Sequence, residues 1–269
     1  MPCIDLHTRA ARPGARFLLA LTTLAAAIGV GEASGAKAPA SPPSDWAYSG
    51  SRGPERWGDL DASFATCRNG RLQSPIDIER ARRVPYVPLV FQYHSQPLEA
   101  YNSGNGIHVI SPPGSALLVR GDVYDLEAFT FHVPGEHRFK GMRPEAEIQL
   151  VHRNRQGAMV VVAVPLRSSG RENRILTRVL DHLPSQPGER VNYRQVGINP
   201  LFLLPSRRGY FHYTGSASTP PCEEPVIWFV LYEPLDVTKD QLRRLAELVG
   251  GNARPVQPLN DREVFLLAH

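Results

Sequence analysis

The chain has 269 residues, of which 42% are hydrophobic and 21% are charged, and its formal net charge is +4. These values are ordinary for a globular protein and exclude a mainly disordered chain. The small positive charge does not indicate a nucleic-acid partner, and we expect none.

The first 38 residues have the order of charged and apolar residues that is typical of a secretory signal peptide. Arg9, Arg12 and Arg16 precede an apolar run over residues 17–30, and small residues follow. The run is shorter than the ~20 residues that a transmembrane helix needs. We therefore expect cleavage and no stable membrane insertion afterwards, with an uncleaved anchor as the alternative. A linker over residues 39–45 then leads to one domain over residues 46–269, in a periplasmic or secreted protein.

Three cysteines are present, and Cys3 lies in the segment that we expect to be removed. Cys67 and Cys222 remain, an even pair in an exported chain. Because disulfides persist in oxidising compartments, we predict a Cys67–Cys222 disulfide, with two separate buried thiols as the alternative.

The domain shows many short strand patterns and few helical ones. The segment 128–132 alternates, with Phe129 and Phe131 on one face and Thr130 and His132 on the other. Further strands are expected over residues 107–110, 116–120, 147–152, 159–166 and 226–232. Helices are expected over residues 171–183 and 238–249, the second with Thr238 as its N-cap. The pattern predicts a mainly β domain with short peripheral helices.

Several ordered motifs occur along the domain and together make a specific signature. They are Trp46-Ala47-Tyr48, Gln73-Ser74-Pro75-Ile76-Asp77-Ile78, Phe131-His132-Val133-Pro134-Gly135-Glu136-His137, Leu150-Val151-His152, and Tyr213-Thr214-Gly215-Ser216-Ala217-Ser218-Thr219-Pro220-Pro221-Cys222. The chain thereby resembles the α-class carbonic anhydrases, in particular their bacterial secreted branch. The resemblance implies a large, mostly antiparallel twisted central sheet with a zinc site in a central cleft. It also implies the disulfide between Cys67 and Cys222.

The resemblance also locates the zinc ligands, and two of the three histidines are replaced. The family's His-x-His pair corresponds to Thr130 and His132, and its third histidine corresponds to Gln149. Only His132 is retained. Zinc prefers imidazole, thiolate or carboxylate ligands, so a hydroxyl and an amide are poor substitutes. We therefore expect a zinc-ligand-deficient member with no cofactor, or zinc if the site is rebuilt.

The other positions that the resemblance marks are partly retained. Glu147 and His137 match groups around the zinc ligands, and Glu136 with Ser218 matches the pair that orients the zinc-bound hydroxide. Asn105 stands where the family has its proton-shuttling histidine, and asparagine cannot relay protons near neutral pH. The residues expected to line the cleft are His108, Val151, Val161, Ala217, Thr219 and Trp228.

These substitutions favour a catalytically inactive binding or interaction protein over an enzyme. Its partner would be a small anion, a saccharide or another protein, and the candidate anion contacts are Arg138, Lys140, Arg143, Arg153 and Arg155. The alternative is an active zinc-dependent carbonic anhydrase with an atypical metal site, built from His108 and His132 with Glu136.

Overall fold

The computed structural model describes residues 46–268. The expected signal peptide (1–38) and linker (39–45) lie outside the described residues. Within 46–268, no helix is both long and apolar enough to cross a membrane.

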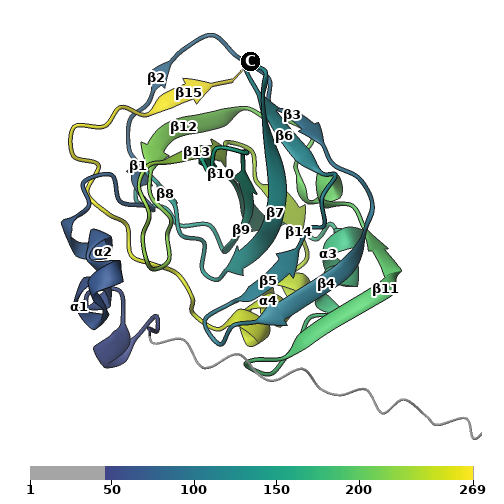
Figure 1. Ribbon diagram of the computed structural model, residues 1–269. Helices are drawn as coiled ribbons and strands as arrows, with labels where there is room; N and C mark the ends of the chain where they lie inside the picture. The colour runs from purple at the N-terminus through teal and green to yellow at the C-terminus, as the bar shows by residue number, and fades with distance from the viewer. Residues whose placement is uncertain (1–45, 269) are drawn as a thin grey trace, which may run out of the picture. The chain divides into compact units, whose positions relative to one another are not determined.

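The described chain is mainly β, as expected, and its strands form one large sheet and one small one (Figure 1). The strands are β1 (Asp77–Ile78), β2 (Arg82–Arg83), β3 (Val90–Gln92), β4 (Gln96–Asn102), β5 (Ile107–Ile110), β6 (Ala116–Val119), β7 (Asp122–His132), β8 (Arg138–Phe139), β9 (Ala146–Arg153), β10 (Met159–Ser168), β11 (Arg190–Ile198), β12 (Tyr210–Gly215), β13 (Val226–Leu231), β14 (Leu235–Val237) and β15 (Phe265–Leu267). The helices are α1 (Trp57–Leu60), α2 (Thr66–Asn69), α3 (Arg174–Leu180) and α4 (Lys239–Val249), with short 3-10 turns at Gly50–Arg52, Ala62–Phe64 and Pro200–Leu203.

The large sheet has the order β11-β4-β5-β7-β9-β10-β13-β12-β15-β2. Most neighbouring strands are antiparallel, but β10 runs parallel to β13 and to β14, and β15 runs parallel to β2. The prediction of a mostly antiparallel sheet is therefore confirmed. Strand β10 is buried along most of its length, which agrees with its continuous apolar run.

The alternation in β7 separates the core from the site. Phe129 and Phe131 are fully buried in the main hydrophobic cluster. Thr130, on the opposite face, pairs with His108 of β5 on one side and with Gln149 of β9 on the other. Three adjacent strands thus present a row of polar side chains on one face of the sheet.

The two longer helices begin where side-chain caps are available. Thr238 is the N-cap of α4, as the sequence predicted, and the structure adds a capping box with Gln241. Helix α3 begins at Arg174, later than the expected start at residue 171, because the Asn173 side chain accepts a hydrogen bond from Leu176 N and sets the start.

A disulfide ties the N-terminal helices to the loop before β13. Cys67 of α2 and Cys222 form the predicted bond, with their Cα atoms 5.0 Å apart and 155 residues between them in sequence. Trp57 packs with both cysteines, and Trp46 and Tyr48 contact this cluster.

Replacing Cys67 and Cys222 by serine should destabilise the fold by about 5 kcal/mol, because the bond closes a very long loop in the unfolded chain. Urea unfolding of the oxidised wild-type protein and of the double serine variant measures this difference. Equal unfolding midpoints with equal slopes would show that the bond adds nothing to stability.

Candidate functional site

A cavity of about 280 Å³ opens above the polar row on β5, β7 and β9. The structure places the following residues singled out from the sequence around it: Asn105, His108, Thr130, His132, Gln149, Val151, Val161, Ala217, Ser218, Thr219 and Trp228. Glu136, His137 and Glu147 do not line the cavity but lie fully buried beside it.

The Gln149 side chain sits between two buried carboxylates. Its amide nitrogen donates to Glu136 Oε2 at 2.7 Å and to Glu147 Oε1 at 2.9 Å. Both N–H groups are thus used, and the amide oxygen accepts a long hydrogen bond from the Ser218 hydroxyl at 3.4 Å. Ser218 therefore makes this contact with Gln149, whereas Glu136, its expected partner, binds Gln149 and the Arg254 main chain.

His132 is held in a defined orientation by the chain after α4. Its Nδ1 lies 3.0 Å from the main-chain oxygen of Asn252. Because a carbonyl only accepts, Nδ1 carries the proton, and in the neutral ring Nε2 keeps its lone pair. The Thr130 hydroxyl lies 3.2 Å from Nε2 and can donate to it. Thr130 thus hydrogen-bonds to the one retained histidine.

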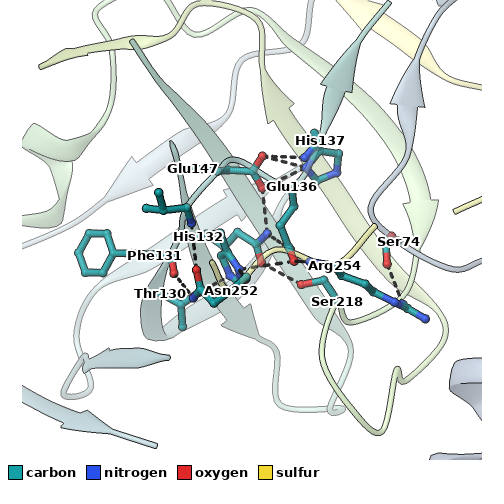
Figure 2. A network of polar contacts seen from close by, with 12 residues as sticks. Ser74, Thr130, Phe131, His132, Glu136, His137, Glu147, Ser218, Asn252 and Arg254 are labelled. Carbon is teal, nitrogen blue, oxygen red and sulfur yellow. Dashed lines mark hydrogen bonds and ion pairs between the residues drawn. The ribbon is translucent and has the colours of Figure 1, made fainter. Parts of the chain in front are cut away.

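Glu147 belongs to a chain of buried polar contacts, and Figure 2 shows it facing His137. His137 Nε2 lies 2.8 Å from the Tyr213 hydroxyl, which in turn donates to Ser74. Burial alone would raise the pKa of Glu147, but His137 and the Gln149 amide outweigh it and lower the pKa to about 2. The carboxylate is therefore ionised at neutral pH.

Arg254 anchors the opposite side of this network (Figure 2). The residue is 1% exposed, and its guanidinium donates to the main-chain oxygens of Ser74 and Cys67. Its main-chain N–H donates to Glu136 Oε1 at 2.8 Å. Burial lowers the pKa of Arg254 to about 10, partly offset by Glu136.

The roles of Asn252 and Arg254 were not predicted from the sequence. They lie in a loop with no helical or strand periodicity, and their partners are more than a hundred positions away in the chain. The sequence shows only that Arg254 precedes Pro255, which favours extended backbone and does not indicate a partner.

His108 forms the far wall of the cavity. Its ring stacks on Tyr101 with centroids 4.6 Å apart, and the Arg190 guanidinium also lies over the Tyr101 ring, 4.6 Å from its centroid. Burial, with a smaller effect of His132, lowers the pKa of His108 to about 4. The ring is therefore neutral at physiological pH.

The side chains at the predicted zinc position do not reproduce a three-histidine site. They offer one imidazole nitrogen, one amide oxygen and one hydroxyl, whereas zinc favours nitrogen, thiolate and carboxylate ligands. In the part of the chain that the structure describes, no three His, Cys, Asp or Glu side chains group so that they could hold a metal ion. Glu136, suggested for a rebuilt site with His108, lies outside the cavity lining.

Replacing Gln149 by leucine should destabilise the protein by about 1–3 kcal/mol at neutral pH, because two buried carboxylates lose a donor. The folded state lowers the pKa of Glu147 from 4.5 to about 2, so its contribution is present above pH 4.5 and is lost as the pH falls toward 2. The deficit of the variant should therefore shrink on acidification through this window.

Urea unfolding of both proteins across that pH range is the measurement. Thr130→Val is the matched control, since it removes a cavity hydroxyl that contacts neither carboxylate. A deficit for Gln149→Leu that does not change with pH would contradict the assigned role of the amide.

Comparison with known proteins places the chain in one family. The family model described as eukaryotic-type carbonic anhydrase matches residues 52–268. A carbonic anhydrase of Nostoc sp. is 36% identical over 226 residues, covering 82% of this chain and 85% of the relative. A carbonic anhydrase of Klebsiella pneumoniae is also 36% identical over 226 residues, covering 82% and 91% of the two chains.

Solved structures agree with this assignment. The α-carbonic anhydrase of Thermovibrio ammonificans, in complex with sulfanilamide, matches with a TM-score of 0.79 at 38% identity, over 82% of this chain and 98% of that chain. Dioscorin, in a crystal structure with ascorbate, matches with a TM-score of 0.77 at 28% identity, over 84% and 99%.

The expectation that the chain takes no cofactor is wrong at the level of the family. It was drawn from the two replaced histidines alone, whereas the relatives are α-type carbonic anhydrases, which depend on zinc. The chain belongs to the α-type carbonic anhydrase family, whose cofactor is zinc.

Proposed function

We propose that this member of the family binds a small, oxygen-rich organic molecule in its cleft and does not hydrate CO2 at the family's rate. The observation that carries the proposal is the position of Gln149, whose amide nitrogen is fixed by two carboxylates. The amide oxygen is thereby left on the cavity side, next to Ser218. An acceptor stands where the family's reaction needs a third imidazole.

The polar groups of the cavity suit hydrogen bonding to hydroxyl and carboxylate groups. The Gln149 oxygen accepts, the Ser218 and Thr130 hydroxyls donate or accept, and a neutral imidazole does both. Among residues 46–268, the His108 ring stacks on Tyr101 and lines the cavity, and no hydrogen bond within the protein involves its nitrogens. A ligand would therefore find unused hydrogen-bonding capacity at His108.

The apolar side of the cavity supports a compact ligand. Val151, Val161 and Trp228 line it, and Ala217 leaves room beside them. Dioscorin, the structural relative complexed with ascorbate, shows that a protein with this fold can hold a small hydroxylated acid. We infer the same chemical class here, a hydroxylated organic acid or a saccharide. A protein partner, which the sequence also allowed, stays a prediction.

We infer that the domain is exported to the periplasm or secreted. The Cys67–Cys222 disulfide supports this, since such bonds persist in oxidising compartments. The composition of residues 1–38 supports it independently.

Restoring both histidines should create CO2 hydration activity. The double variant Thr130→His with Gln149→His returns three imidazoles to adjacent positions on β7 and β9. Zinc is supplied in excess to both proteins, and CO2 hydration is measured by stopped flow. After the buffer rate is subtracted, the rate of the variant should be at least about a hundredfold higher than that of the wild type. A wild-type rate equal to that of the variant would overturn the proposal, and the two single variants serve as controls.

Ascorbate should bind the wild-type protein with one site per chain in isothermal titration calorimetry. His108→Ala should weaken the binding by roughly tenfold, because one hydrogen bond is worth about 1 kcal/mol or slightly more. His212→Ala is the control, since His212 lies outside the cavity lining, beside Phe229 and Phe265. If neither ascorbate nor a panel of hydroxylated acids and monosaccharides binds, the ligand class is wrong.

A further inference from the structure

A tight hairpin places two arginines opposite each other, away from the cleft. Phe139 and Met142 exchange both main-chain hydrogen bonds, at 2.8 and 3.1 Å. Only Lys140 and Gly141 lie between them, with φ values of 51° and 79°. Positive φ at both central residues is the geometry of the two-residue turns that match the twist of a hairpin.

The register of this hairpin makes Arg138 and Arg143 the next pair. One step beyond a pair that exchanges both hydrogen bonds, the opposed side chains lie on the same face and come closer together. The two chain segments stay together beyond this point, since Gly135 N donates to Pro144 O at 3.0 Å. The register therefore places Arg138 and Arg143 on the same face of the hairpin, and the charge of Arg138 acts on Arg143.

Neither arginine has an acidic partner among residues 46–268. Asp77, which pairs with Arg138 in the β1–β8 register, instead accepts from Gly141 N at 3.0 and 3.1 Å. Glu145 accepts from Ser168 N at 2.6 Å. Both of these carboxylates thus accept from main-chain donors.

Both arginines also keep an unsatisfied donor. The Nε atoms of Arg138 and Arg143 are buried and contact no acceptor in the described chain. Burial lowers the pKa of Arg143, and the charge of Arg138 lowers it further, while Glu136 and Glu147 act in the opposite direction from a distance. Like charges directly opposed on a hairpin are unfavourable, and so are buried donors without acceptors.

We propose that Arg138 and Arg143 form a binding site for a small oxyanion such as phosphate or sulfate. Guanidinium groups bind such anions through paired N–H donors, and one anion between two arginines would neutralise their repulsion and accept from both. The site is independent of the cleft and of the function proposed for it.

The surroundings distinguish this pair from the other basic residues in the same part of the sequence. Arg153 is already paired with Glu127 and Glu223. A cavity of about 310 Å³ lies against Arg143, between the hairpin and the exposed Tyr232. An anion can therefore reach Arg143 through this cavity. Arg138 does not line the cavity, but its side chain is only partly buried.

Thermal unfolding of the purified protein in sodium phosphate, sodium sulfate and sodium chloride at equal ionic strength tests the site. At an anion concentration of about ten times Kd, phosphate and sulfate should raise the melting temperature by about 3–6 °C over chloride. Arg138→Gln and Arg143→Gln should each lose this rise. In chloride each variant should melt no lower than the wild type, because the repulsion is removed.

Arg243→Gln on α4 is the matched control, since Arg243 is paired with Asp240 and Glu247 and should keep the rise. Broadening of the ³¹P line of inorganic phosphate gives a second readout that does not depend on the unfolding transition. A rise that is equal in all three salts, or that persists in the Arg138→Gln, Arg143→Gln double variant, would overturn the site.

A phosphate group on a lipid offers the same chemistry, so cosedimentation with phosphatidylglycerol vesicles separates the two sources. Response to free phosphate without vesicle binding supports the proposal. Vesicle binding that the two variants abolish, with no response to free phosphate or sulfate, would overturn it in favour of a lipid surface.

Discussion

The amide of Gln149 is the contact on which the floor of the cleft depends. Two carboxylates, Glu136 and Glu147, are fully buried next to each other, and uncompensated buried charges are costly. A primary amide carries two N–H groups in one plane, so it can donate to both carboxylates at once. A metal-binding imidazole at this position would have only one N–H left to donate. Gln149 therefore donates to both carboxylates, which a metal-binding imidazole could not do.

The hydrogen bonds of Gln149 connect the cavity with the buried polar network of the interior. Toward the cavity, Ser218 hydrogen-bonds to the Gln149 oxygen. Toward the interior, Glu147 keeps its contacts with His137, and through Tyr213 the network reaches Ser74. Because the buried acceptors are satisfied, the polar layer stabilises the strands around it.

Much of this arrangement was predictable from local patterns, and the rest depends on distant contacts. The alternation over residues 128–132 separates Phe129 and Phe131 from Thr130 and His132, and the structure has this division. The Cys67–Cys222 bond followed from compartment chemistry. The role of Asn252 could not be predicted, because it depends on where a loop returns beneath β7. The expectation of no cofactor was wrong because it was based on two replaced ligands in this chain alone. Replaced ligands do not reveal that the family as a whole depends on zinc.

The two faces of β7 explain how the site could change while the fold was kept. The core face buries Phe129 and Phe131, which pack against each other in the main hydrophobic cluster, so substitutions at Thr130 and Gln149 do not remove this contact. The same separation holds at the hairpin, where the turn fixes the positions of Arg138 and Arg143 whatever their charge. In both places the main chain sets the geometry and the side chains set the chemistry. A few side-chain substitutions can therefore change which groups this fold presents to a ligand without changing the main-chain geometry.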